Sequence, residues 1–212
     1  MREASRTHDP ASAAQDSGDA TLERALVRHT FDLMRSGALG SAFAATLFTL
    51  GVATIADAWR TTTWAAVSLA SILVNLAIHR AYATGRLGRS LVTHRAVRRL
   101  GVVATGLAWG AGGLLFPLRD ELGPGFALVF CYAGLCAGAA TTMAGDPLSY
   151  VLLCVTALSP DIVLAFPTLW WVSALLVTFV LVTTRAVVRN ARALETSLAL
   201  RIENATLLAQ TV

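Results

Sequence analysis

The sequence contains no lysine, so all 17 of its basic residues are arginines. We attribute this absence to a compositional bias and draw no function from it. Charged residues make up only 14% of the 212 residues, against about 25% in a soluble globular domain. So few charges leave no room for a soluble catalytic domain, and we expect most of the chain to lie in an apolar environment.

Short motifs that carry chemistry are also missing. The sequence has no Gly-x-Ser-Gly of a rhomboid protease, no His-Glu-x-x-His, no Walker loop and no dinucleotide fingerprint. Cysteine is scarce, and the spacing of Cys131, Cys136 and Cys154 is not that of a zinc site. We interpret these thiols as small apolar side chains. The sequence therefore predicts no catalytic residue, no metal site and no cofactor.

Long apolar runs fill almost everything between residues 37 and 188. The runs are residues 38–56, 64–78, 100–116, 126–144, 148–166 and 169–188. In lipid a backbone amide has no water to bond, so such runs must be helical, and about 20 residues cross a hydrocarbon core about 30 Å thick. The mean hydropathy of +0.61 agrees. We predict an all-α protein built as a six-helix transmembrane bundle.

The arginines predict how this bundle is oriented. The strongest basic cluster lies between the second and third runs: His79, Arg80, Arg86, Arg89, His94, Arg95, Arg98 and Arg99. Positive loops stay in the cytoplasm. The connections on the opposite side are short and hold only Arg60 and Arg119. We therefore predict a multi-pass protein of the bacterial inner membrane with both termini in the cytoplasm, a lipid bilayer as its partner and no nucleic acid.

The flanks of the bundle differ in character. Residues 1–20 have low hydrophobicity and are expected to be disordered. Residues 21–36 are expected to form an amphipathic cytoplasmic helix on the inner leaflet, or alternatively an extension of the first span. The membrane domain then covers residues 37–188. Trp59, Trp64, Trp170 and Trp171 are expected at the outer ends of the spans, as an aromatic belt.

The segment 189–212 continues the sixth span without proline or glycine. Its apolar stripe recurs at steps of four and three, with one gap: Val187, Ala191, Leu194, Leu198, Ala205, Leu208 and Val212. This heptad pattern is typical of a coiled coil. We expect a cytoplasmic coiled-coil-like helix that forms a homodimer and leads into an output domain outside this sequence. An ordinary surface helix is the alternative.

Polar residues inside the apolar runs are the candidates for a ligand pocket. A buried carboxylate costs about 2.5–3.5 kcal/mol on insertion scales, yet Asp161 lies within the fifth run, directly after the helix-bending Pro160. We group Asp161 with Trp109, Asn75 and Tyr132 as candidate ligand-binding residues. The alternative is that Asp161 lies near enough to the outer interface to reach water or Arg119.

Two further sets of residues receive structural roles. Gly106 and Gly110, and likewise Gly134 and Gly138, lie four residues apart. This spacing allows close helix packing, so we expect the third and fourth runs to pack on each other or across a dimer. Signal relay is assigned to Pro160, Leu194, Leu198 and Leu208.

The arrangement resembles the six-span membrane sensor region of bacterial sensor histidine kinases, especially hybrid ones, and of some membrane diguanylate cyclases. The resemblance is carried by the basic cluster at residues 95–99, the following Ala108-Trp109-Gly110, and the exit helix with RALETSLALRIENATLLAQ. It implies a sensory and dimerisation domain that relays a signal through the sixth span. Because the outer loops are only a few residues long, a lipophilic signal, such as a fatty-acid-like or ketone-like molecule, would suit the geometry. No phosphoacceptor or nucleotide-binding motif of a kinase occurs, so no functional residue is carried over.

Two other functions stay open. A small secondary transporter could use Asp161 as a titrating group, although transporters usually have paired broken helices. A membrane cytochrome or redox sensor would need two histidines inside the bundle.

Overall fold

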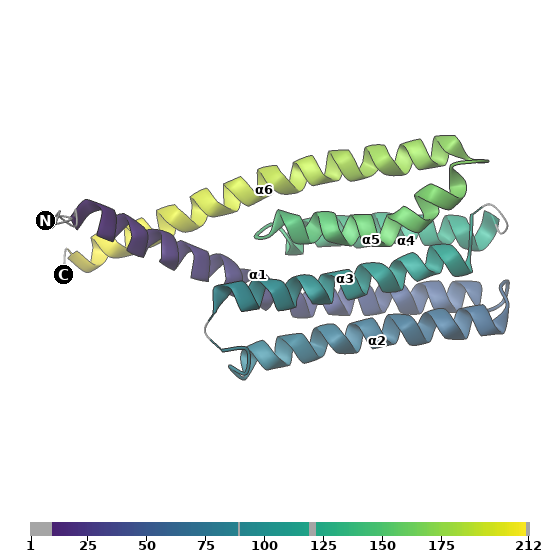
Figure 1. The fold of residues 1–212 in the computed structure, drawn as a ribbon, viewed down its shortest axis with the longest axis horizontal. Helices are drawn as coiled ribbons and strands as arrows, with labels where there is room; N and C mark the ends of the chain where they lie inside the picture. Colours follow the sequence, from purple (N-terminus) through teal and green to yellow (C-terminus); the bar gives the residue numbers. More distant parts are fainter. Residues whose placement is uncertain (1–9, 89, 119–121, 211–212) are drawn as a thin grey trace, which may run out of the picture.

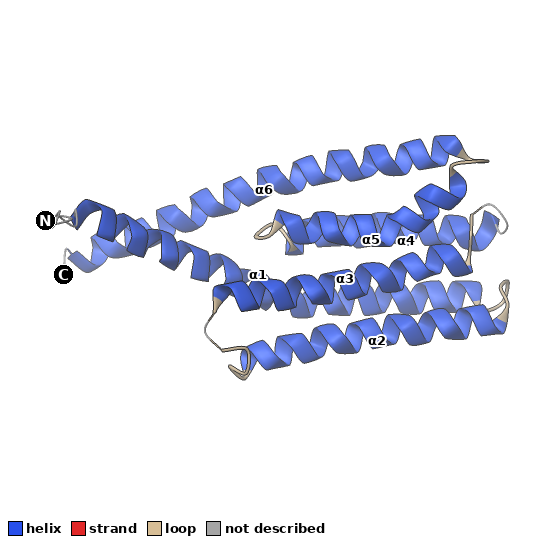
Figure 2. Ribbon diagram, viewed as in Figure 1, coloured by secondary structure: helices blue, strands red, loops and turns tan. Residues whose placement is uncertain are grey.

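The computed structural model describes residues 10–88, 90–118 and 122–210. This part of the chain is all-α, as predicted (Figure 2). Its helices are α1 (Pro10–Val52), α2 (Ala58–Ala83), α3 (Leu91–Leu115), α4 (Leu122–Thr142), α5 (Pro147–Ala165) and α6 (Trp170–Gln210).

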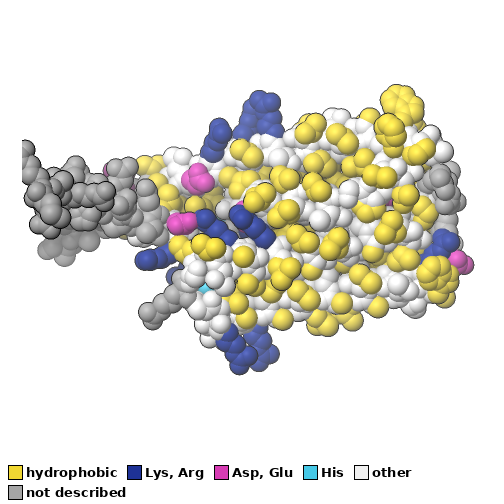
Figure 3. All heavy atoms as spheres, in the orientation of Figure 1, with side chains coloured by type: hydrophobic (Ala, Val, Ile, Leu, Met, Phe, Trp, Pro, Cys, Tyr) yellow, Lys and Arg dark blue, Asp and Glu magenta, His cyan; other side chains and the backbone are white. Residues whose placement is uncertain are grey.

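Five of these helices are long and apolar enough to cross a membrane. The spans lie within Thr21–Val52, Ala58–Ala83, Gly123–Thr142, Pro147–Ala165 and Trp170–Ala205. Helix α3 is not among them because its hydropathy is lower: its first turns carry three arginines and the rest is rich in glycine. Apolar side chains are spread over the visible face of the bundle, while most of the visible arginines lie towards the end where the termini lie (Figure 3). The chain is a multi-pass membrane protein with five or six spans.

The helices run up and down, and both termini lie at the same end (Figure 1). The α2–α3 and α4–α5 connections also lie towards this end, whereas the α1–α2 and α5–α6 connections lie at the opposite end, as do the end of α3 and the start of α4 (Figure 1). Helices α1 and α6 both extend beyond the bundle and cross near their free ends (Figure 1). Alternating connections of this kind are what a membrane bundle with short loops requires.

Helix α1 differs from the expected division of the N-terminal region. It is continuous from Pro10 to Val52, so residues 21–36 form an extension of the first span and not a separate helix on the leaflet. Residues 10–20 belong to the same helix, contrary to the expected disorder, and residues 1–9 lie outside the described part of the chain. A continuous helix satisfies every internal backbone group across both segments, whereas a break would leave several unpaired.

Aromatic rings form the centre of the core. Trp64 packs edge-on against Phe48 of α1 with ring centroids 4.7 Å apart, and against Trp109 of α3 at 5.3 Å. Tyr132 of α4 continues the row, 6.1 Å from the Trp109 ring. Trp64 is fully buried, whereas Trp59 is 60% exposed. Trp64 is therefore a core residue and does not belong to the expected belt.

The packing of α3 also differs from the expectation. Its most extensive contact is with α5, and it meets α4 only slightly. Gly106 and Gly110 face α5. Gly134 and Gly138 of α4 have no atom within 4 Å of the position that a Cβ would take. The two glycine pairs therefore do not pack against each other within the chain.

Candidate functional site

Three of the four predicted pocket residues meet in the core. Asp161 of α5 is 2% exposed and Tyr132 of α4 is 1% exposed. The Tyr132 hydroxyl donates to Oδ2 of Asp161 at 2.7 Å and lies 3.0 Å from the Trp109 carbonyl oxygen. Asp161 is therefore buried within the bundle, and Arg119 lies outside the described residues. The cluster therefore joins α3, α4 and α5 through polar groups in an apolar core.

The cluster has more acceptors than protons if Asp161 is ionised. A tyrosine hydroxyl has one proton to donate, and here two oxygens lie within hydrogen-bonding distance of it. A protonated Asp161 would donate to Tyr132 and free the tyrosine proton for the Trp109 carbonyl. The neutral acid also avoids placing a charge in hydrocarbon, which is costly.

Asn75 lies apart from this cluster. Its Nδ2, which carries two hydrogens, lies within hydrogen-bonding distance of three acceptors: the Ser71 carbonyl at 2.9 Å, the Gly101 carbonyl at 3.1 Å and Oγ1 of Thr105 at 2.8 Å. Gly101 precedes Trp109 by eight residues, which is about 12 Å along the helix. Asn75 therefore fastens α2 to the arginine-rich half of α3.

Helix α3 approaches α5 closely because it carries glycine where they meet. A Cβ built on Gly110 would lie 2.5 Å from the Thr156 carbonyl oxygen and 3.3 Å from Cγ of Pro160. A Cβ on Gly113 would overlap the Asp161 carboxyl group. Pro160 has no N–H to bond the Thr156 carbonyl, so the proline in α5 and the glycines in α3 fit together.

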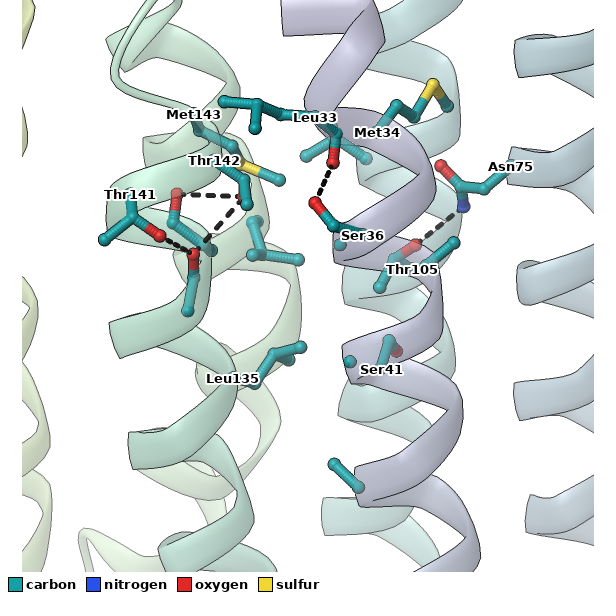
Figure 4. Close-up of a pocket in the computed structure, with 18 of the residues that line it drawn as sticks. Leu33, Met34, Ser36, Ser41, Asn75, Thr105, Leu135, Thr141, Thr142 and Met143 are labelled. Carbon is teal, nitrogen blue, oxygen red and sulfur yellow. Dashed lines mark hydrogen bonds between the residues drawn. The ribbon is translucent and has the colours of Figure 1, made fainter.

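A cavity of about 300 Å³ lies between α1, α3 and α4, with α2 and α5 completing its walls (Figure 4). Its lining residues include Leu33, Met34, Ser41, Asn75, Arg98, Thr105, Gly134, Leu135, Gly138, Thr142, Met143 and Leu153. Small-molecule pockets range from about 300 to 1,000 Å³, so this one is at the small end. Of the four predicted ligand residues only Asn75 lines it. Gly134 and Gly138 of α4, which were expected to pack against another helix, also line it.

Arg98 is the one charged residue among those that line this cavity. Its side chain is only 5% exposed. Nη1 of Arg98 donates to Oδ2 of Asp146 and to Oγ of Ser149, both at 3.3 Å. Arg99 binds the same carboxylate through two donors, at 3.1 and 3.2 Å. Two arginines therefore share one carboxylate beside the cavity.

Asp146 precedes α5 in the turn outside the spans, and its pKa reflects this network. Burial raises the pKa, but hydrogen bonds from Arg99 and Ser149 and the charges of Arg98 and Arg99 outweigh it. The pKa of Asp146 therefore lies below its usual range, and the carboxylate is charged at neutral pH.

Sequence reasoning treated Arg98 only as a signal of membrane topology. Helical spacing offered a way to find it, because Arg98, Gly101 and Val102 share one face of α3 and all three are buried. An arginine that is followed at helical spacing by glycine and valine predicts burial of its charge.

No metal-binding cluster of three or more His, Cys, Asp or Glu side chains occurs within the described ranges. The buried Sγ atoms of Cys136 and Cys154 lie 3.8 Å apart, and both cysteines are free.

The chain matches no protein-family model, no curated protein and no solved structure. Its class is defined by the fold and the composition, as an α-helical multi-pass membrane protein.

Proposed function

We propose that this chain is the membrane-embedded sensory and dimerisation domain of a two-component sensor histidine kinase in the bacterial inner membrane. It detects a lipophilic or membrane-derived signal and relays it through the sixth span, α6, to a cytoplasmic output domain. A diguanylate cyclase output would use the same relay.

The observation that carries this proposal is the length of α6. The helix has 41 residues without interruption, which is about 60 Å at 1.5 Å per residue. The hydrocarbon core is only about 30 Å thick. Roughly half of α6 therefore projects beyond the membrane, and a continuous helix carries a rotation or an axial shift along its whole length.

The packing of α6 supports a link between the bundle and this projection. Val187 is fully buried and Ala191 is 6% exposed, while Leu194 and Leu198 are half-buried. The turn between α4 and α5 lies between α1 and α6: a Cβ on Gly145 would be 2.6 Å from Cγ2 of Thr30 and 4.0 Å from Cδ2 of Leu194. A displacement of this turn would press directly on α6, the relay helix.

Dimerisation through the apolar stripe of α6 is tested by cysteine crosslinking in membranes. Leu198→Cys lies on the stripe, and Leu200→Cys, which is 54% exposed on another face, is the matched control. Both are made with the three native cysteines replaced by alanine. Leu198→Cys should form disulfide-linked dimers under mild oxidation and Leu200→Cys should form few. The absence of crosslinks at both Leu198 and Leu194 would exclude the dimeric relay, and equal crosslinking at Leu200 would show random collision.

A further inference from the structure

The geometry points to a binding site for a medium-chain fatty carboxylate in the cavity between α1, α3 and α4. The inference rests on the proposed function and deepens it, because it names the chemical class of the signal.

The size of the cavity selects a single short chain. A water molecule in the liquid occupies about 30 Å³, and a methylene group is of similar size. A cavity of about 300 Å³ therefore holds about ten such groups. The two acyl chains of a phospholipid would exceed it several-fold.

The cavity opens through residues that lack side chains. Gly134 and Gly138 of α4 and Gly40 of α1 are exposed, and no atom lies within 4 Å of the position of a Cβ on any of them. Both helices are membrane spans, so this opening faces the apolar layer. A lipophilic ligand would enter sideways from the membrane, past the glycines, without passing through water.

The walls beyond the opening suit an acyl chain. Leu33 of α1 points towards Met143, which follows α4, on one side of the cavity (Figure 4). Met34 of α1 and Leu135 of α4 also line it. Apolar walls are the environment in which methylene groups are stabilised, by about 0.8 kcal/mol for each group removed from water.

The polar end of the site favours an anion. Arg98 is the charged residue of the lining, and its Nη1 bonds Asp146 and Ser149. Arg99, the other partner of Asp146, does not line the cavity and its side chain is 34% exposed. A ligand carboxylate beside Arg98 would accept charge-assisted hydrogen bonds, which are about twice as strong as those that an alcohol or a ketone would accept.

Binding would also reach the relay helix. A carboxylate on Arg98 competes with Asp146, whose next neighbour, Gly145, lies between Thr30 and Leu194. Weakening the Arg98–Asp146 pair would allow the α4–α5 turn to move, and this movement would change its contact with α6. The contact with the ligand head group and the contact with α6 therefore both involve the α4–α5 turn.

The test uses the purified chain in nanodiscs, with empty nanodiscs subtracted, and equilibrium binding of radiolabelled decanoate at pH 7. Unlabelled decanoate should compete at least about tenfold better than 1-decanol, because hydrogen bonds to charged groups are the stronger ones. Gly138→Leu, which fills the opening, should weaken decanoate binding at least about tenfold. Gly51→Leu is the matched control, since Gly51 also has open space around its Cβ position but does not line the cavity.

The head-group contact is tested by Arg98→Gln, which should abolish the preference for decanoate over decanol. Arg99→Gln, which changes the other partner of Asp146, should retain it. If Arg98→Gln does not fold, the decanol competition on the unchanged protein still decides the point. Equal competition by decanol, unchanged binding to Gly138→Leu, or equal competition by a two-chain phospholipid would each overturn the inference. Binding without dimer crosslinks at Leu198 would refute the proposed relay alone, and crosslinks without binding would refute this site alone.

Discussion

Asp146 is the residue on which the arginine-rich end of the bundle depends, because it accepts hydrogen bonds from both Arg98 and Arg99. Its side chain is 12% exposed and that of Arg98 is 5% exposed. Removing one member of such a pair leaves an uncompensated buried charge, which is far more costly than losing a pair in water.

The first prediction is that Asp146→Asn destabilises the folded chain by about 3–5 kcal/mol. Asp57→Asn is the control, since Asp57 is 62% exposed and pairs with Arg60 at 3.4 Å; its loss should cost less than about 1 kcal/mol. The measurement is the thermal unfolding midpoint of each variant in the same detergent, followed by circular dichroism. Equal midpoints for the two variants would show that the buried network contributes nothing.

The lowered pKa of Asp146 adds a second prediction, on pH. The unfolded chain takes up the Asp146 proton near pH 3.9, and the folded chain takes it up only at a lower pH. The contribution of Asp146 is therefore fully present above about pH 4 and is lost as the pH falls through the folded-state pKa. Unfolding midpoints measured from pH 6 to pH 3 should fall less steeply for Asp146→Asn than for the unchanged protein. Parallel curves would contradict this.

Tyr132 carries the third prediction. Tyr132→Phe removes the hydroxyl that bonds Asp161 and leaves a buried carboxyl group without its partner, at a cost of about 1–3 kcal/mol. Tyr150→Phe is the control: Tyr150 is fully buried, and its hydroxyl lies near Thr183 and Cys154 with no carboxyl group among the described residues as a partner. Denaturation of both variants in detergent should show a loss only for Tyr132→Phe. A similar loss for both would mean that ring packing, and not the hydrogen bond, stabilises the cluster.

At the scale of helices, the α3–α5 contact has no room for side chains where the two helices cross. The Thr156 carbonyl of α5 is a backbone group next to Gly110, so it cannot move aside as a flexible side chain would. The glycines of α4 have the opposite surroundings, since Gly138 lies beside open space. The glycine pairs of α3 and α4 have the same spacing but different roles: those of α3 allow close packing on α5, and those of α4 lie beside open space.

The fourth prediction follows from that contrast. Gly110→Ala should destabilise the bundle by about 1–3 kcal/mol, as overpacking does. Gly138→Ala should be neutral or stabilising, because alanine favours a helix by up to about 1 kcal/mol over glycine. Retention of folded protein after heating, measured by size-exclusion chromatography, separates the two. If Gly110→Ala were as stable as Gly138→Ala, the close α3–α5 approach would be wrong.

At the scale of the whole molecule, charge sets the orientation. The α2–α3 connection carries the arginines and lies towards the same end as both termini, whereas the α5–α6 connection lies at the opposite end (Figure 1). Positive loops stay in the cytoplasm, so the fifth prediction concerns labelling from outside the cell. In a chain without native cysteines, Thr168→Cys should react with a membrane-impermeant thiol reagent on intact spheroplasts. Arg86→Cys should react only after permeabilisation, and the reverse pattern would invert the topology.

The local pattern of residues was enough to predict the helices. Apolar runs of about 20 residues must be helical in lipid, and the absence of proline and glycine after Val187 predicted that α6 would continue. These properties depend on neighbours within a few residues along the chain.

Only the tertiary structure decided which faces of the helices meet. It placed α3 on α5 and not on α4, buried Trp64 in the core and Arg98 beside a cavity, and left Asn75 two turns of α3 from the residues it was grouped with. A helix presents similar small residues on several faces, and the choice among them is made by contacts between segments far apart in the sequence. The sequence by itself therefore determined an all-α membrane chain with a long exit helix, while the location of the cavity and its buried charge arose from packing between helices.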